Sequence, residues 1–322
     1  MKKKILVVTP VHHIEGFLER LKKNFVTINL NNPTEKQLLK KIKNVDFIFT
    51  NPNMSKIYFS EKNLSLAKNL KCICTASTGT NHIDKKYIKK NKIKLISLRS
   101  KKSIISKISS TAEHAFALML CSLRLICQSS SSVKKNKWNY LPFIGRQLNF
   151  LTVGVIGYGR LGKMFVNFLK PFTKNILIYE SNFNLSDSNK KYQTSLKNLL
   201  IKSDIISLHI HADDRNKNFL NQNKFKYMKK NVLIINTSRG EIINEFHLKS
   251  FLNKNKNSKY ATDVLRNEIR KRSNNKILKE FKKNNKQIII TPHIGGMTED
   301  AQRIAYNSAL DELIKSNNNN EF

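Results

Sequence analysis

Short apolar runs alternate with stretches of helical periodicity through the first hundred residues of the chain. Runs rich in Ile and Val predict β-strands at residues 4–8, 25–29, 45–50, 70–77 and 93–97. Between them, apolar residues at helical spacing predict helices at residues 14–23, 34–42 and 61–68. Strands that alternate with helices are typical of βαβ units, so this segment is predicted to be a small α/β domain with a parallel sheet.

The second half of the chain repeats this alternation after one long apolar segment. Residues 109–127 are apolar almost all round after His114, which predicts a buried helix. Trp138, the only tryptophan, follows in a polar connection and is expected to pack over a cleft or on the core. Strands are then predicted at 153–156, 175–180, 204–210, 232–237, 260–265 and 287–290, and helices at 195–201, 223–228, 244–252 and 298–315. Six such strands indicate a doubly wound parallel sheet, and residues 317–320 are expected to fray.

A glycine-rich turn joins the first strand of this second sheet to a helix that continues to residue 170. The turn reads Gly157-Tyr158-Gly159-Arg160-Leu161-Gly162. In this spacing the first glycine permits a tight turn, the second lets a pyrophosphate approach the backbone, and the third lets the helix pack closely on the strand. Glu180 ends the next strand, about where an acid that binds the adenosine ribose belongs. The pattern predicts a Rossmann dinucleotide site, and a glycine-rich turn with a chance acid is the less favoured interpretation.

The charge balance is the most unusual bulk property. Lys and Arg number 59 against 22 Asp and Glu, a net charge of +37. Binding to nucleic acid or to an anionic surface is one interpretation. The lysines, however, are scattered in ones and twos without a concentrated arm or an aromatic-interleaved patch. We therefore favour a compositional bias that decorates exposed faces, and we expect no nucleic-acid partner.

Length and local patterns bound the class of protein. At 322 residues the chain favours two domains, and no apolar run approaches the ~18 residues needed to span a bilayer. The start imitates a secretory signal, but Thr9 and Pro10 end the apolar segment too early, so it is interpreted as the first strand. The four cysteines are Cys72, Cys74, Cys121 and Cys127. They lack metal-site spacing, and we expect reduced core residues, no metal and a cytoplasmic protein.

Polar side chains with complementary chemistry stand at the ends of three later strands. Arg239, Glu268 and His293 follow the strands predicted at 232–237, 260–265 and 287–290. Parallel strands bind ligands beyond their carboxyl ends, so these side chains are expected to converge. Arg239 can bind the carboxylate of a 2-oxo acid in bidentate fashion. His293 can hand a proton to the carbonyl oxygen while a nicotinamide delivers hydride, and a neighbouring Glu268 favours the protonated imidazole.

Each of the three residues also has an ordinary interpretation. Arg239 could form a surface ion pair, and His293 could cap a strand. Glu268 lies in a charged stretch with Arg266, Arg270, Lys271 and Arg272 and could be a member of a charged surface. Their joint occurrence at successive strand ends favours the catalytic interpretation.

The same stretches resemble the D-isomer-specific 2-hydroxyacid dehydrogenases, a family that includes D-3-phosphoglycerate dehydrogenase and glyoxylate/hydroxypyruvate reductases. The matching residues occur in the family's order at 79–84, 111–114, 153–162, 208–209, 236–240, 263–264 with Glu268, and 292–298. The resemblance implies an α/β chain of two domains. The expected NAD-binding Rossmann domain covers residues 103–297, and a smaller flavodoxin-like substrate domain combines residues 1–102 and 298–322.

The resemblance also assigns roles to single residues. Arg239, Glu268 and His293 take the catalytic roles described above. The implied substrate-binding residues are Ser77, Thr78, Gly79 and Arg239. The implied cofactor-binding residues are Gly157, Tyr158, Gly159, Arg160, Leu161, Gly162, Glu180, His209, Thr237 and Asp263. Among these, Asp263 is expected to bind the nicotinamide amide, and Glu180 the adenosine ribose.

Two departures from the family pattern bear on these expectations. Leu265 and Ile269 stand where the family commonly has Phe and Pro, so the loop that carries Glu268 is expected to differ in shape. An acid at position 180 repels a 2′-phosphate, which favours NAD over NADP.

The expected activity is hydride transfer between NAD and a D-2-hydroxy acid/2-oxo acid pair, with 3-phosphoglycerate or a related small acid as substrate. A glyoxylate/hydroxypyruvate reductase and a non-catalytic, NAD(H)-sensing, corepressor-like binding protein are the alternatives. We expect a homodimer without a membrane partner. Because the chain stops at Phe322, no C-terminal regulatory domain is expected.

Overall fold

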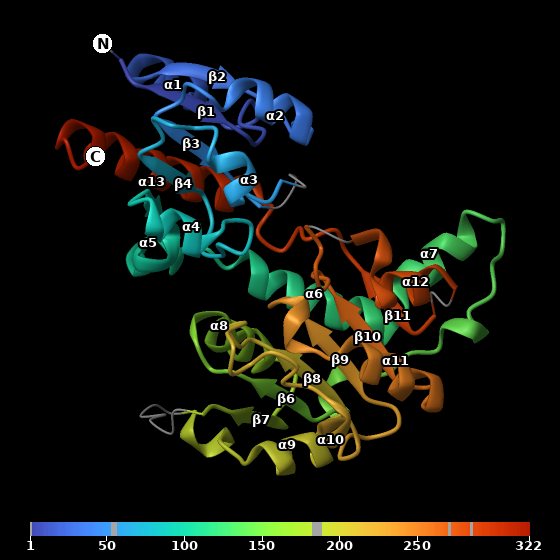
Figure 1. Cartoon of the computed structure of the whole chain (residues 1–322). Helices are drawn as coiled ribbons and strands as arrows, with labels where there is room; N and C mark the ends of the chain where they lie inside the picture. Colours follow the sequence, from blue (N-terminus) through green and yellow to red (C-terminus); the bar gives the residue numbers. More distant parts are fainter. Residues whose placement is uncertain (1, 53–56, 182–188, 270–271, 284–285) are drawn as a thin grey trace. The chain divides into compact units, whose positions relative to one another are not determined.

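The computed structural model describes every residue except 1, 53–56, 182–188, 270–271 and 284–285. The chain divides into two compact units, Met1–Ile108 with Gly296–Phe322, and Ser109–Gly295 (Figure 1). The sequence placed the corresponding boundaries at residues 102/103 and 297/298. The first unit extends further because Ile105 and Ile108 pack against its core.

The first unit is built on a parallel sheet with the strand order β2-β1-β3-β4-β5. Its strands are β1 (Lys4–Val7), β2 (Val26–Asn29), β3 (Phe47–Thr50), β4 (Cys72–Thr75) and β5 (Lys94–Ile96). Its helices are α1 (Phe17–Asn24), α2 (Glu35–Lys41), α3 (Glu61–Leu64), α4 (Lys85–Lys90), α5 (Lys102–Ile105) and α13 (Glu299–Asn318). The five predicted strands are confirmed with shorter bounds. Helix α4 was not predicted, because it carries one buried residue, Ile88, among lysines.

Alternate residues of these strands face two different cores. Ile5 and Val7 belong to the core that also contains Phe17 of α1 and Tyr306 of α13. Leu6 lies between them on the opposite face, in the core covered by α2, α3 and α4. The central strands β1, β3 and β4 are thus buried on both faces, which is why they are continuous apolar runs in the sequence, whereas the edge strand β2 is partly exposed.

The end of the C-terminal tail packs on the first unit, beyond residues 317–320, whose predicted fraying stays a prediction. The Phe322 ring lies 5.0 Å from the Phe47 ring, centroid to centroid. Glu321 forms an ion pair with Lys94. Helix α13 itself continues to Asn318, because its buried residues, such as Leu310 and Leu313, keep it on the core.

The second unit is built on a parallel sheet with the order β11-β10-β9-β8-β6-β7. Its strands are β6 (Val153–Ile156), β7 (Ile176–Tyr179), β8 (Ile205–Leu208), β9 (Leu233–Asn236), β10 (Lys259–Thr262) and β11 (Ile288–Ile290). Its helices are α6 (Ser110–Arg124), α7 (Ile126–Val133), α8 (Arg160–Leu169), α9 (Leu196–Lys202), α10 (Gln222–Phe225), α11 (Glu245–Lys254) and α12 (Lys276–Lys283). Helices α6 and α8 contribute to the core on one face of the sheet, and α9 to α12 to the core on the other. The predicted doubly wound α/β fold is confirmed.

The long predicted helix at 109–127 is broken, so this prediction is wrong in part. Leu125 adopts a left-handed conformation with φ 56°, and α6 and α7 meet there at an angle of 60°. Ala112 and Met119 of α6 are buried as expected, whereas Ile126 of α7 is 48% exposed. The packing of α6 on the core of the second unit ends at Leu125. The apolar residues that follow, such as Ile126, lie at the surface.

Several residues expected in the core lie at the surface instead. Trp138 is 91% exposed, so it packs on no core of this chain. Cys72 and Cys74 are buried, but Cys121 is only partly buried and Cys127 is exposed. All four cysteines are free thiols.

Among the described residues, no single helix is both long and apolar enough to cross a bilayer. The bent pair Lys102–Arg124 and Ile126–Val133 meets that criterion only when its two parts are taken together.

Candidate active site

The glycine-rich turn follows β6 at the point where the order of the second sheet reverses. The chain runs from β6 to β7 on one side and then to β8 on the other, which places a ligand crevice at the carboxyl ends of β6 and β8. Gly157 has φ 94°, and a Cβ there would lie 2.7 Å from the carbonyl oxygen of His209. A Cβ at Gly162 would lie 2.1 Å from the Gly157 carbonyl oxygen. Both positions therefore exclude any side chain.

Gly159 differs from these two glycines because a Cβ there would meet nothing within 4 Å. The protein itself thus gives no steric reason for glycine at this position, and its backbone is open to a ligand. Gly159 is the N-cap of α8, so unpaired N–H groups and the positive end of the helix dipole lie beside the opening. An open backbone next to such a helix start fits the pyrophosphate of a dinucleotide.

The acid predicted to bind the ribose lies next to this turn. Glu180 follows β7, and its Oε2 accepts a hydrogen bond of 2.7 Å from the Tyr158 N–H. Burial lowers the pKa of Arg160 at the start of α8, although its guanidinium remains a cation at neutral pH. Leu161 packs against the core of the second unit. The role of Glu180 towards the ribose stays a prediction.

His209 and Thr237 lie after the neighbouring strands β8 and β9. The Nε2 of His209 is 2.8 Å from the Ser207 hydroxyl, and its ring lies 4.9 Å from that of Phe165, centroid to centroid. Burial lowers the pKa of His209 to about 3, so the imidazole is neutral. Thr237 is 6% exposed. The backbone of His209 lies against Gly157 of the glycine turn, and direct contact of either residue with the cofactor stays a prediction.

Arg239 is positioned by the close crossing of two loops. A Cβ at Gly240 would lie 2.1 Å from the backbone nitrogen of Arg266, so the turn after β9 touches the loop after β10. The Asn236 side chain donates a hydrogen bond of 2.9 Å to the Arg239 carbonyl oxygen, which fixes the turn. The positive charge of Arg239 helps to lower the pKa of Glu268. The two predicted residues are therefore electrostatic neighbours.

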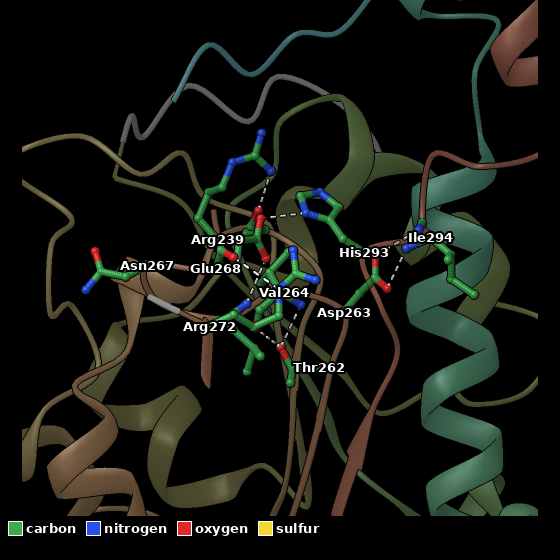
Figure 2. Close-up of polar contacts among 12 residues, drawn as sticks. Arg239, Thr262, Asp263, Val264, Asn267, Glu268, Arg272, His293 and Ile294 are labelled. Carbon is green, nitrogen blue, oxygen red and sulfur yellow. Dashed lines mark hydrogen bonds and ion pairs between the residues drawn. The ribbon is translucent and has the colours of Figure 1, made fainter. Parts of the chain in front are cut away.

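Glu268 and His293 are in direct contact. His293 Nδ1 lies 2.6 Å from Glu268 Oε1, and Glu268 Oε2 accepts a hydrogen bond from the Leu265 N–H at 3.1 Å (Figure 2). Burial raises the pKa of Glu268, but the hydrogen bond and charge of His293 outweigh burial, so this pKa lies below its ordinary value. The carboxylate is thus ionised and can stabilise an imidazolium. Of the charged stretch that formed the competing interpretation, Arg270 and Lys271 lie outside the described residues, Arg272 donates to the Glu268 carbonyl oxygen at 3.1 Å, and Arg266 donates to the Glu241 carbonyl oxygen at 3.0 Å.

The backbone of His293 has an unusual conformation. Its φ is 59°, in the left-handed region that few residues other than glycine adopt. Asp263 lies beside it, 2% exposed, and accepts hydrogen bonds from the N–H groups of Ile294 at 2.8 Å and Gly295 at 2.7 Å (Figure 2). The structure thus engages both carboxylate oxygens of Asp263 with the chain. Its contact with a nicotinamide amide stays a prediction.

Three of the four predicted substrate-binding residues, Ser77, Thr78 and Gly79, lie in the first unit, after β4. The Ser77 hydroxyl donates to the Gly79 carbonyl oxygen at 2.7 Å and lies 2.9 Å from the Thr75 hydroxyl. These bonds give the loop 77–79 a defined shape at a strand end. Its role in substrate binding stays a prediction, as does that of Thr78.

Sequence reasoning missed two residues that contact this site. His114 of α6 and Thr291, which follows β11, are hydrogen-bonded at 2.8 Å and both approach Asp263. His114 lies in one of the stretches that carried the family resemblance, but a histidine in an apolar helix gives no indication of its partner. Only the placement of α6 on the sheet brings the two together.

Comparison with known proteins identifies the class. The model of the family "D-isomer specific 2-hydroxyacid dehydrogenase, NAD binding domain" matches residues 116–295, more than half of the chain. The chain belongs to this family.

Individual relatives narrow the likeness further. The chain is 30% identical over 316 residues to the D-3-phosphoglycerate dehydrogenase of Methanocaldococcus jannaschii, an alignment that covers 97% of this chain and 57% of that protein. It is 29% identical over 252 residues to the hydroxypyruvate reductase of Thermotoga maritima, covering 78% and 79%. The crystal structure of D-lactate dehydrogenase from Aquifex aeolicus, complexed with NAD and lactic acid, matches with a TM-score of 0.74 and 26% identity over 97% and 94% of the two chains. The chain thus spans little more than half the length of the phosphoglycerate dehydrogenase.

Proposed function

We propose that the protein is an NAD-dependent oxidoreductase that interconverts a D-2-hydroxy acid and the corresponding 2-oxo acid. The observation that carries this proposal is the 2.6 Å contact between His293 Nδ1 and Glu268 Oε1. Arg239 lies near enough to shift the pKa of that carboxylate. An arginine, an imidazole and its carboxylate partner beside a dinucleotide turn are the groups that reduction of a 2-oxo acid requires.

Each residue has a distinct task in the proposed reaction. Arg239 binds the substrate carboxylate with its guanidinium and holds the adjacent carbonyl in place. Glu268 occupies Nδ1 of His293, so the opposite nitrogen, Nε2, is the one that gives its proton to the carbonyl oxygen. NADH, when bound, would supply a hydride to C2 of the 2-oxo acid, and NAD⁺ would accept a hydride from C2 of the hydroxy acid. In the oxidative direction His293 takes the proton back from the hydroxyl group.

The substrate is proposed at the level of a class. The relatives are named for phosphoglycerate, hydroxypyruvate and lactate, so a small 2-hydroxy acid is the common element. We propose 3-phosphoglycerate or a related small acid, with glyoxylate/hydroxypyruvate reduction as the alternative. Arg99, Lys101 and Lys102 follow the last strand of the first unit and form a basic cluster. This cluster gives limited support to a phosphorylated substrate, because Lys101 is already paired with Glu312 at 2.6 Å.

One substrate panel tests the proposal. Purified protein is mixed with NADH or NADPH and with phosphohydroxypyruvate, hydroxypyruvate, glyoxylate or pyruvate, and oxidation of the cofactor is followed by its absorbance. We expect turnover with NADH on at least one 2-oxo acid and weaker use of NADPH, because Glu180 repels a 2′-phosphate. Binding of NADH without turnover on any acid would contradict the enzymatic proposal and favour the sensing protein.

We also propose a homodimer and a cytoplasmic location. None of residues 124–147 is buried in the single chain, although Trp138, Tyr140 and Ile144 are among them. Such an exposed apolar segment is typical of a subunit contact. The four free thiols support a reducing compartment. Sedimentation analysis of the wild type and of Trp138→Ser tests the dimer, which we expect the substitution to weaken.

A further inference from the structure

The loop that carries His293 is held by one buried carboxylate. Asp263 Oδ1 accepts the N–H of Ile294 at 2.8 Å, and Asp263 Oδ2 accepts the N–H of Gly295 at 2.7 Å. These two N–H groups follow directly after His293. The φ of 59° at His293 costs conformational energy, which contacts of the neighbouring residues have to offset. The two bonds to Asp263 turn the chain sharply at His293, and Figure 2 shows Asp263 beneath this turn.

Asp263 is itself held by a hydroxyl and an imidazole. The Thr291 hydroxyl donates to Asp263 Oδ1 at 2.6 Å, and the next acceptor, the Thr262 carbonyl oxygen, is 3.5 Å away. Thr291 has a single hydroxyl proton, so towards His114 Nε2, at 2.8 Å, its oxygen accepts. The hydrogen bond thus requires a proton on Nε2 of His114, which also lies 3.4 Å from Asp263 Oδ1.

Packing joins this chain of bonds to helix α6. A Cβ at Gly295 would lie 3.0 Å from Asp263 Oδ2, 3.5 Å from the Thr111 methyl group and 3.7 Å from the His114 ring. A side chain at this position would press on Asp263 Oδ2, and the loop lies within van der Waals reach of Thr111 and His114 in α6. Burial raises the pKa of Asp263, but the hydrogen bonds from His114, Thr291 and the two N–H groups outweigh it, so the pKa falls below its ordinary value. The carboxylate that holds the loop is therefore ionised at neutral pH.

We infer that His114, Thr291 and Asp263 are positioning residues that set the backbone of His293 and thereby hold its imidazole against Glu268. This inference rests on the proposed function for its catalytic consequence, but its structural part stands without turnover. Helix α6 carries no residue of the proposed catalytic set. Through His114 it would nevertheless affect the reaction, because His114 helps to position His293. The buried carboxylate of Asp263 gains a role in holding the protein loop, beside the contact with the nicotinamide amide that the family resemblance implies.

Substitution of His114 provides the first test. His114→Leu removes the donor to Thr291, and we expect kcat to fall about 10- to 100-fold, the usual consequence of a small displacement of a catalytic group, with NADH affinity changed less than about twofold. His114→Gln keeps a nitrogen donor at nearly the same reach, so it should recover most of the activity. His247→Leu is the matched control, because His247 is also a partly buried helical histidine of the second unit, and it should leave kcat unchanged.

A double-mutant cycle separates positioning from cofactor binding. If His114 acts through His293, His114→Leu has little further effect on kcat in a His293→Ala background. A loss of NADH affinity that persists in that background would overturn the inference, since it would place the network at the nicotinamide. Equal activity of the Leu and Gln variants, both at the wild-type level, would overturn it too.

Hydrogen exchange tests the structural part in the cofactor-free protein. The N–H groups of Ile294 and Gly295 should exchange slowly in the wild type and at least about tenfold faster in His114→Leu, but not in His247→Leu. Thr291→Val, which keeps the shape and removes the hydroxyl, should have the same effect and serves if His114→Leu does not fold. This measurement is independent of turnover, so failure of the proposed reaction and failure of the network give different results. Unchanged exchange in both variants would refute the network.

Discussion

The two units wind their sheets in the same way, yet only one of them presents a dinucleotide turn. Each sheet places its second strand at one edge, then the first, the third and the later strands in order. The order reverses between β1 and β3 in the first unit and between β6 and β8 in the second. Both units therefore offer a crevice at equivalent strand ends.

The residues that follow the first strand of each sheet make the difference. After β6 the glycine turn leaves the backbone open at Gly159. After β1 the chain continues into Thr9, whose buried hydroxyl lies 3.1 Å from the hydroxyl of Tyr306 in α13 of the same unit. Asn51, after β3, also bonds Tyr306. The strand order of each sheet creates a crevice for a ligand, and in the first unit the side chain of Tyr306 occupies this crevice.

The largest expected effect concerns the chemistry assigned to the second unit. His293→Ala removes the proton donor, so kcat should fall by about 10²- to 10⁴-fold while NADH still binds. Steady-state kinetics and a fluorescence titration with NADH measure the two quantities. His247→Ala, on α11 of the same unit, is the control and should retain activity. If His293→Ala kept more than about a tenth of the wild-type kcat, the chemistry would have to be placed elsewhere.

The next effect separates a glycine needed by a ligand from one needed by the fold. Gly159→Ala meets no protein atom within 4 Å at a φ of −72°, so stability should be kept, but NADH affinity should fall about 10- to 100-fold. Gly16 in the first unit is the counterpart, since it has φ 67° and an equally open Cβ position. Gly16→Ala should cost about 1 kcal/mol of stability and leave NADH affinity unchanged. Calorimetry and NADH titration of both variants would expose an error if the two effects were exchanged.

A smaller effect tests the filled crevice of the first unit. Tyr306→Phe should destabilise the protein by about 1 kcal/mol at neutral pH, because Thr9 and Asn51 lose a buried partner. Burial raises the pKa of Tyr306 above its ordinary value of 10.0. The stability that depends on the neutral phenol is thus complete below pH 10 and is lost as the pH rises through the raised pKa. The gap between wild type and variant should therefore narrow in alkali, and a gap that widens in urea titrations at alkaline pH would contradict this account.

The smallest expected effect concerns acid. The pKa of Glu268 lies below its ordinary value of 4.5, so its ionised form contributes stability that is complete above that value and is lost as the pH falls through the lowered pKa. Glu268→Gln removes this contribution. We expect the wild type to lose its advantage over the variant on acidification, as measured by urea unfolding at about pH 7 and about pH 3.5. A constant difference across that range would mean that the Glu268–His293 contact is absent in solution.

The sequence predicted most of the sheet framework and the three residues at the strand ends. Strands buried on both faces are continuous apolar runs, and residues that follow such runs meet at one edge whatever the loops do. Arg239, Glu268 and His293 could be selected for that reason.

What could not be predicted depends on side-chain contacts between distant elements. His114 and Thr291 are 177 residues apart in the chain, and they meet only because α6 packs on the sheet of the second unit. Leu125 ends α6 in a left-handed turn although nothing in its side chain disfavours a helix. The exposure of Trp138 could not be predicted either. Hydrophobicity favours burial of a side chain, but it does not show whether the side chain is buried within its own chain or against another.

Because Gly240 lies against the backbone of Arg266, the loops after β9 and β10 have to move together. A displacement of Arg239, the proposed ligand of the substrate carboxylate, would therefore also displace the loop that carries Glu268. An engineer who wishes to accept a bulkier acid would therefore have to transplant both loops together.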